Sequence, residues 1–251
     1  MHQVYTPLVG LLQVNFGGFV PLSTVDWYGI ATCTVFFRGC PVRCTYCHNR
    51  AIQEGEDLRD VDDVRDLIRS SRMLISGVVF SGGEPTMQKD PLLYLAEESK
   101  KMGLKVGVQT NGVFPDTLEA LLGRRLVDRI ALDVKARWER YDNLLKKKYS
   151  SQVRKSLSLC SKAFEEGLLP EFEVVITLFR GYEDEVKYIV RDLPKGILVL
   201  QQGVDGSIPP LQEQEMKLIA DGLGMKVKIR TRGEGEIEYE SSRSRRSACE
   251  R

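Results

Sequence analysis

Short apolar segments alternate with longer amphipathic ones along most of this chain, and no other feature of the sequence restricts the possible folds as much. The apolar segments are rich in Val and Ile and mostly unbroken, which is typical of strands buried on both faces. Seven strands are predicted, at Cys33–Arg38, Gly77–Ser81, Lys105–Thr110, Arg129–Val134, Phe172–Leu178, Gly196–Gln201 and Lys226–Arg230. The amphipathic segments predict helices at Val61–Ser71, Asp90–Met102, Pro115–Arg124, Glu183–Asp192 and Leu211–Gly222, and a helix pair across Trp138–Glu166.

A strand–helix–strand unit repeated six times predicts right-handed crossovers and a parallel sheet that curls toward a barrel. The predicted fold class is therefore α/β, a partial (β/α)6 TIM-like barrel that is open on one side. We expect residues 31–232 to form this barrel. Residues 1–30 are expected to be an N-terminal extension, as a hairpin or a cap over the barrel. Residues 233–251 are polar and are expected to form a disordered tail.

The charge balance gives no argument for a polyanionic partner. Lys and Arg number 36 and Asp and Glu 35, so the net charge of +1 favours neither nucleic acid nor an anionic membrane surface. The longest apolar stretches, such as Ile75–Phe80, are too short to span a bilayer, and residues 1–16 lack the pattern of a secretory signal. We therefore expect a cytoplasmic protein whose six cysteines act as ligands, catalytic groups or core residues rather than in disulfides.

Three of the six cysteines, Cys40, Cys44 and Cys47, lie within eight residues directly after the first predicted strand. Parallel α/β folds place their chemistry at this end of the strands, and the spacing lets one loop direct three thiolates to a metal centre. A structural zinc site needs a fourth ligand, and His48 adjoins Cys47, so both side chains would rarely face one ion. A 4Fe–4S electron carrier usually has four cysteines. Three thiolates therefore favour a four-iron cluster with one iron free to bind another molecule.

The C-x3-C-x2-C spacing, with the aromatic Tyr46 before the last cysteine, resembles the signature of the radical S-adenosylmethionine (SAM) superfamily. This resemblance implies an oxygen-sensitive 4Fe–4S cluster on Cys40, Cys44 and Cys47, whose free iron chelates the amino and carboxylate groups of SAM. An electron from the cluster then cleaves SAM into methionine and a 5′-deoxyadenosyl radical. The superfamily has partial or full barrels. The alternatives for the three cysteines are a zinc site or a chance grouping.

The ends of later strands resemble further elements of the superfamily. Gly82-Gly83-Glu84 is similar to the Gly-Gly-Glu element that holds the amino group of SAM, although a tight turn with a surface carboxylate is the alternative. Asn111 lies in a segment similar to the Thr-Asn-Gly of activating enzymes, and it also fits a simple Asn-Gly turn. The resemblance implies a SAM site that includes these four residues.

Two more strand ends and the cysteine loop complete the implied SAM site. Asp133-Val134-Lys135 resembles the Asp-x-Lys element beside the cofactor in glycyl-radical activating enzymes, or it is a structural ion pair. Gln201 follows a leucine, as in the Leu-Gln-x segment near the end of these barrels. The full set implied to bind SAM is Tyr46, Cys47, His48, Gly82, Gly83, Glu84, Asn111, Asp133, Val134, Lys135 and Gln201. By contrast, Phe36, Phe37, Cys33 and Cys160 are expected in the core.

The resemblance is closest to the activating enzymes of anaerobic ribonucleotide reductase and pyruvate formate-lyase. Leu22–Gly29 is similar to the Ser-x-x-Asp-Tyr-Pro-Gly segment of one branch, with Trp27 and Tyr28 in place of Tyr-Pro. This implies an anaerobic enzyme that abstracts a Cα hydrogen from a glycine of a partner enzyme, with flavodoxin or ferredoxin as electron donor. One alternative is a radical SAM enzyme that acts on a small molecule or RNA base, as 7-carboxy-7-deazaguanine synthases do. The other is a non-catalytic iron–sulfur or zinc interaction protein.

Overall fold

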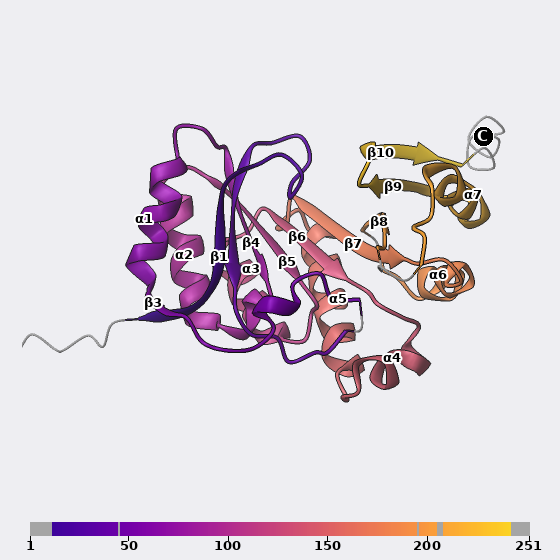
Figure 1. The fold of residues 1–251 in the computed structure, drawn as a ribbon, viewed down its shortest axis with the longest axis horizontal. Coiled ribbons are helices and arrows are strands. Elements are labelled where there is room, and N and C mark those ends of the chain that lie inside the picture. Colours follow the sequence, from indigo (N-terminus) through magenta and orange to yellow (C-terminus); the bar gives the residue numbers. More distant parts are fainter. Residues whose placement is uncertain (1–11, 45, 195, 205–207, 242–251) are drawn as a thin grey trace, which may run out of the picture.

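The computed structural model describes residues 12–44, 46–194, 196–204 and 208–241. One ten-stranded sheet runs through the chain in the order β10-β9-β8-β7-β6-β5-β4-β2-β1-β3 (Figure 1). Neighbouring strands from β2 to β9 in this order pair in parallel. These seven strands are β2 Thr32–Phe37, β4 Gly77–Gly82, β5 Lys105–Thr110, β6 Arg129–Asp133, β7 Glu171–Leu178, β8 Ile197–Gln202 and β9 Lys226–Thr231. The predicted α/β class and partial barrel are confirmed.

The helices lie close to their predicted positions. They are α1 Val61–Ser71, α2 Lys89–Lys101, α3 Pro115–Gly123, α4 Trp138–Leu145, α5 Ser150–Glu165, α6 Glu183–Arg191 and α7 Glu213–Leu223, with short 3-10 turns η1 Arg50–Ile52 and η2 Pro85–Met87. Local signals fix several of their starts. The carboxylate of Asp60 accepts a hydrogen bond from the Asp62 N–H at 2.9 Å and so caps α1, and Pro115 occupies the first turn of α3. No helix in the described ranges is long and apolar enough to cross a membrane.

Three antiparallel strands extend the parallel sheet at its two edges. β1 Gln13–Ser23 pairs with β2 and with the short β3 Leu58–Asp60, and β10 Gly235–Glu240 pairs with β9. The division of the chain at residues 30 and 232 stays a prediction, and residues 1–11 and 242–251 lie outside the described part.

The expectation of a disordered tail is wrong for the residues of β10. Ile237 and Tyr239 of this strand pack against the hydrophobic core, while Glu236 pairs with Lys228 and Arg230 of β9. One face of the strand therefore contacts apolar side chains, and Glu236 on the other face contacts two partly buried cations. Such a strand cannot be predicted from its polar composition, because the partners that stabilise Glu236 lie in β9 and not in the local sequence.

The two faces of the sheet have different surroundings. Val78 and Phe80 of β4 belong to the large apolar core that the sheet shares with the helices. On the other face, Ala131, Val175 and Val199 form a small separate apolar cluster. This second face is the inside of the curved sheet, and most of its remaining positions are polar. The interior of the barrel therefore offers space and polar groups for a site.

Candidate functional site

A cavity of about 360 Å³ lies inside the barrel, lined by the loop after β2 and by the strands from β4 to β9. It brings together twelve of the thirteen different residues predicted from the sequence. They are Cys40, Cys44, Tyr46, Cys47, His48, Gly82, Gly83, Glu84, Asn111, Asp133, Lys135 and Gln201. Strand ends far apart in the sequence thus meet at one place, as the parallel topology requires.

Val134 is the predicted site residue that does not reach the cavity. Its side chain is buried in the core between sheet and helices, and its backbone N–H donates to the Val175 carbonyl at 2.9 Å. Successive side chains along a strand point to opposite faces, so Asp133 and Lys135 face the interior while Val134 faces away.

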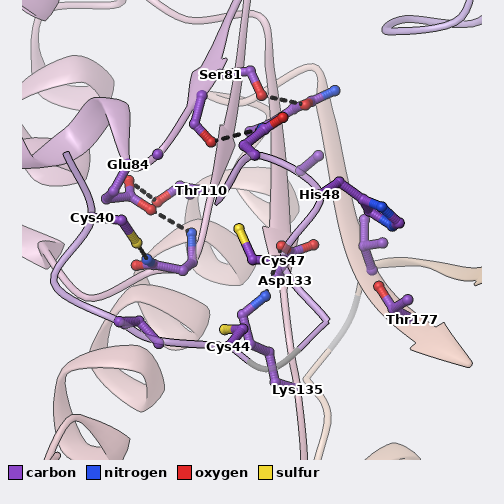
Figure 2. Close-up of a pocket in the computed structure, with 18 of the residues that line it drawn as sticks. Cys40, Cys44, Cys47, His48, Ser81, Glu84, Thr110, Asp133, Lys135 and Thr177 are labelled. Carbon is purple, nitrogen blue, oxygen red and sulfur yellow. Dashed lines mark hydrogen bonds and ion pairs between the residues drawn. The ribbon is translucent and has the colours of Figure 1, made fainter. Parts of the chain in front are cut away.

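The three clustered cysteines face the cavity as free, partly buried thiols (Figure 2). Burial raises the pKa of the Cys40 thiol to about 11 and also raises that of Cys44. No group of three His, Cys, Asp or Glu side chains within the described ranges is arranged to hold a metal ion. Three thiols that reach one cavity from a single loop are chemically suited to the separate iron atoms of an iron–sulfur cluster.

Backbone hydrogen bonds join the two ends of the cysteine loop. The N–H of Gly39 donates to the Ile52 carbonyl at 2.8 Å, and the N–H of Cys40 donates to the Gln53 carbonyl at 3.1 Å. The Arg38 guanidinium donates to the carbonyls of Phe16 and of residues at the far end of the loop. The first and last residues of the thiol-bearing loop are therefore bonded to each other, and Arg38 also bonds the loop to β1.

The glycines at the end of β4, Gly82 and Gly83, allow this loop to lie directly on the strand end. A Cβ atom on Gly82, whose φ is +121°, would lie 2.3 Å from the Phe37 carbonyl oxygen. A Cβ atom on Gly83 would lie 2.2 Å from the Gly39 carbonyl oxygen. In this close approach the Gly83 N–H donates to Phe37 and the Glu84 N–H donates to Gly39. Only glycine permits backbones to come so near each other.

Glu84 is fully buried and is not the surface carboxylate of a simple turn. Its Oε1 accepts hydrogen bonds from the Thr86 N–H and from the hydroxyls of Thr86 and Thr110. Its Oε2 accepts from the Asn111 N–H at 2.8 Å. Burial raises the pKa of Glu84, and these donors oppose the rise without cancelling it. The carboxylate thus connects the end of β4 to the end of β5.

Asn111 is also held on both sides. Its Oδ1 accepts from the Val113 N–H at 3.0 Å, and its Nδ2 donates to the Cys40 Sγ at 3.6 Å. The Asn-Gly turn predicted for this segment is present, with Gly112 at a φ of +74°. The turn does not account for the contact with Cys40, which no local pattern predicts.

Asp133 and Lys135 form an ion pair with 3.0 Å between Oδ2 and Nζ. Burial alone would lower the pKa of Lys135, but the charge of Asp133, with Tyr46 and Cys44, raises it well above its usual value. The Lys135 Nζ lies 5.8 Å from the centre of the Tyr46 ring, which in turn packs against the Phe179 ring at 4.7 Å. The ammonium group of Lys135, paired with Asp133, therefore lies close to the cysteine loop.

Several cavity residues were not predicted from the sequence. Ser81 donates to the Gln109 side-chain carbonyl at 2.7 Å, and Gln109 donates to the Asp26 carbonyl at 3.2 Å. Asn49, Thr177 and Arg230 also line the cavity, and so does Phe36, which was expected in the core. Thr177 of β7 pairs with Gln201 of β8, so the two side chains lie next to each other on one face of the sheet. The alternation of side chains along β7 could therefore have predicted Thr177 as a cavity residue. Asp26 had no such signal.

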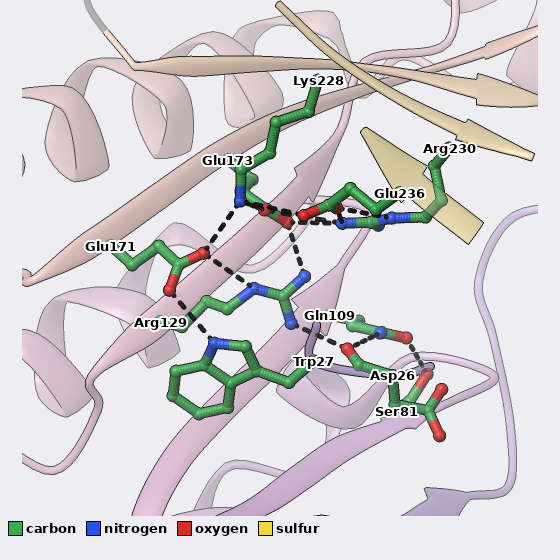
Figure 3. A network of polar contacts seen from close by, with 10 residues as sticks. All are labelled: Asp26, Trp27, Ser81, Gln109, Arg129, Glu171, Glu173, Lys228, Arg230 and Glu236. Carbon is green, nitrogen blue, oxygen red and sulfur yellow. Dashed lines mark hydrogen bonds and ion pairs between the residues drawn. The ribbon is translucent and has the colours of Figure 1, made fainter. Parts of the chain in front are cut away.

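A layer of charged side chains lies at the other end of the barrel interior (Figure 3). We define this charged layer as Arg129, Glu171, Glu173, Lys228, Arg230 and Glu236. Arg129, Ala131 and Asp133 follow one another at alternate positions of β6, so the layer lies at the amino-terminal end and the cysteines at the carboxyl end. Ion pairs rather than apolar side chains thus close the bottom of the barrel.

The segment between β1 and β2 covers this layer. The indole N–H of Trp27 donates to the Glu171 carboxylate at 3.0 Å, and the Tyr28 ring lies 5.1 Å from the Arg230 guanidinium carbon. The Trp27 ring also lies against Gly107, where a Cβ would be 3.0 Å away. The two residues that depart from the Tyr-Pro pattern therefore have defined packing roles at the closed end of the barrel.

A model of the radical SAM superfamily matches residues 34–193, which is more than half of the sequence. The chain therefore belongs to the radical SAM superfamily. Members of this superfamily use a 4Fe–4S cluster and SAM, and these are the cofactors of this chain.

Three curated relatives have matching sequences. A protein of Methanocaldococcus jannaschii with the provisional name glycyl-radical enzyme activating enzyme is 33% identical over 164 residues, which cover 60% of this chain and 65% of the relative. The pyruvate formate-lyase-activating enzyme of Clostridium pasteurianum is 32% identical over 120 residues, 45% of this chain and 49% of that enzyme. The 7-carboxy-7-deazaguanine synthase of Hyperthermus butylicus is 37% identical over 89 residues, 34% and 37% of the two chains. The matches thus span less than two thirds of each relative.

Solved structures show the same fold at low sequence identity. QueE from Escherichia coli aligns with a TM-score of 0.52 at 15% identity, over 84% of this chain and 89% of that one. TYW1 with a lysine-pyruvate adduct bound aligns with a TM-score of 0.59 at 18% identity, over 84% and 80% of the two chains. Both alignments support the partial barrel.

Proposed function

We propose that Cys40, Cys44 and Cys47 hold the 4Fe–4S cluster and that the chain activates a glycyl-radical enzyme. The observation that supports the ligand assignment best is that all three thiols of the loop reach one cavity, together with nearly every other residue implied to bind SAM. When bound, the cluster and SAM supply a carbon-centred radical that can abstract a hydrogen atom.

The residues of the cavity wall offer the polar groups that SAM requires. SAM carries an ammonium and a carboxylate, and the ion pair of Asp133 and Lys135 presents the complementary charges beside Tyr46. Ser81, Gln109, Thr177 and Gln201 add hydroxyl and amide groups to the cavity wall. The Glu84 carboxylate already accepts hydrogen bonds from protein donors. Its first role is therefore to hold together the strand ends that form the wall of the SAM site.

The proposed substrate is a glycine residue of a large partner enzyme. The hydrogen atom would leave the glycine Cα, so that the radical remains on the partner. The names of the two relatives that are 33% and 32% identical support this choice. The sheet also supports it, because its edge strands β3 and β10 lie at opposite ends of the strand order and leave the barrel open. A flavodoxin or ferredoxin in the cytoplasm is the proposed electron donor.

One observation favours a second candidate. The match to a 7-carboxy-7-deazaguanine synthase has the highest identity of the three relatives, 37%, although over the shortest stretch. In that case the substrate would be a small molecule such as 6-carboxytetrahydropterin, and no protein partner would be needed.

The two candidates are separated by electron paramagnetic resonance. Anaerobically reduced protein is incubated with SAM and with the glycyl-radical enzymes of the same organism. The proposal predicts the doublet of a glycyl radical on one partner, and its absence when that glycine is replaced by alanine. Turnover of 6-carboxytetrahydropterin without any doublet would instead establish the second candidate.

A further inference from the structure

One of the three thiols receives a side-chain hydrogen bond from a distant part of the chain. The Asn111 Nδ2 lies 3.6 Å from the Cys40 Sγ, although the two residues are 71 positions apart in the sequence. Asn111 follows β5, whereas Cys40 follows β2, and β4 lies between these strands in the sheet. The contact therefore depends on the tertiary structure and not on the cysteine loop itself.

The orientation of the Asn111 amide is fixed by its other bonds. The Oδ1 accepts from the Val113 N–H at 3.0 Å, so the Nδ2 and its protons must point to the opposite side, where the Cys40 sulfur lies. The Asn111 backbone N–H donates to the Glu84 Oε2 at 2.8 Å. The residue is also almost completely buried, with 7% of its surface exposed. Rotation of the amide away from the sulfur would thus leave buried groups without partners.

Glu84 links this donor to the strand that supports the cysteine loop. Its backbone N–H donates to the Gly39 carbonyl at 2.9 Å, directly before Cys40, while its carboxylate binds Asn111 and Thr110. One buried residue therefore positions both the donor amide and the peptide next to the acceptor sulfur. Such a supported contact is expected to keep its geometry when the cluster changes charge.

A hydrogen bond to a cluster thiolate stabilises the reduced cluster more than the oxidised one, because the reduced cluster has one more negative charge. Hydrogen bonds to the sulfurs are among the factors that set the reduction potential of an iron–sulfur cluster. We propose that Asn111 is a positioning residue that raises the reduction potential of the 4Fe–4S cluster through its hydrogen bond to Cys40. This inference rests on the proposed ligation of the cluster by Cys40.

The test is a potentiometric titration of the full chain after anaerobic reconstitution, with the reduced cluster followed by electron paramagnetic resonance and without SAM or any partner. Two variants are compared with the unchanged protein. Asn111→Ala removes the donor without adding charge. Asn111→Asp keeps an oxygen that can accept from the Val113 N–H but has no N–H to donate.

A matched pair of controls uses Asn15, whose amide is bound in a similar way but not to sulfur. Its Oδ1 accepts from the Asp57 N–H at 2.9 Å, and its Nδ2 donates to the Gly55 carbonyl at 3.1 Å. Asn15→Ala and Asn15→Asp therefore remove a comparable loop contact on the far side of β2, outside the cavity.

We expect the ratio of reduced to oxidised cluster at a fixed solution potential to fall about tenfold in Asn111→Ala, which is ~59 mV for a one-electron couple. In Asn111→Asp it should fall by at least as much, and in the Asn15 variants it should stay unchanged. Wild-type potentials in both Asn111 variants would overturn the inference, and so would an equal fall in the Asn15 variants. Failure of both Asn111 variants to bind a cluster would also overturn it, because Asn111 would then be needed for assembly. Absence of a 4Fe–4S signal in the unchanged protein would instead contradict the proposed function.

Discussion

Arg129 and Glu173 form an ion pair between two neighbouring strands inside the barrel, with 2.5 Å between Nη2 and Oε2 and with 1% of each side chain exposed. Lys228 and Arg230 of β9 contact the same glutamate, at 2.9 and 3.2 Å. Three cations therefore surround one carboxylate at the closed end of the barrel. Charges buried in this way are stable only while every partner is present.

Glu173→Gln should strongly destabilise the fold. The substitution removes the nearest counter-ion of the buried Arg129 and leaves it the 3.7 Å contact with Glu171, and the removal of one partner from a buried pair typically costs about 3–5 kcal/mol. The free energy of unfolding in urea at neutral pH measures the loss. The control is Glu238→Gln, which breaks the exposed pair with Lys226 and should cost less than about 1 kcal/mol. Equal losses in the two variants would show that the charged layer is not buried as described.

The stabilisation by Glu173 should depend on pH at the acidic end of the range. Burial alone would raise the pKa of its carboxyl, but the charges of Arg129 and Arg230 and the contact with Lys228 lower it from 4.5 to about 2. A carboxyl with a lowered pKa stabilises the fold fully above its unfolded-state pKa, and the stabilisation is lost as the pH falls toward the folded-state value.

Unfolding in urea at several pH values between 6 and 2 checks this dependence. The difference in stability between the unchanged protein and Glu173→Gln should be constant at the upper end and should decrease below about pH 4.5. A difference that grows as the pH falls would contradict the sign of the effect.

Gly83→Ala should prevent the cysteine loop from docking on β4. The added Cβ would lie 2.2 Å from the Gly39 carbonyl oxygen, and neither backbone can retreat without the loss of the hydrogen bonds between the two segments. We expect less iron per chain after anaerobic reconstitution and a lower melting temperature. Gly123→Ala is the control, because nothing lies within 4 Å of the added atom at that position. A Gly83→Ala protein with full iron content would show that the close approach is not required.

Much of the fold was predictable because its elements depend on local sequence. The parallel strands begin and end within about one residue of the predicted segments, since each strand presents Val, Ile, Leu or Phe side chains to the core that the sheet shares with the helices. The helix α1 at Val61–Ser71 has the predicted bounds, because Asp60 caps its first turn. β10 was missed because its stability comes from contacts with β9 rather than from its own composition.

The candidate site was predictable where a motif ends a strand, and unpredictable where contacts join distant residues. Cys40 and Gly83 are marked by local patterns, and the cavity contains both. The bond from Asn111 to Cys40 and the bond from Trp27 to Glu171, 144 positions away, have no local signal. Val134 was predicted to bind SAM because it lies within the Asp-x-Lys motif. The alternation of side chains along a strand instead directs it into the core.

The central claim, that this cysteine loop holds a cluster that cleaves SAM, is tested most directly by the formation of 5′-deoxyadenosine. Anaerobically reconstituted protein is reduced, mixed with SAM, and analysed for this product and for iron. The unchanged protein should form it, and Ala substitution of Cys40, Cys44 or Cys47 should abolish both the product and the cluster.

Cys33→Ala and Cys160→Ala should retain both the product and the cluster, since these two thiols are buried in the core away from the cavity. Unchanged protein that binds only zinc and forms no 5′-deoxyadenosine would contradict the account. So would a folded Cys160→Ala protein that has lost its iron.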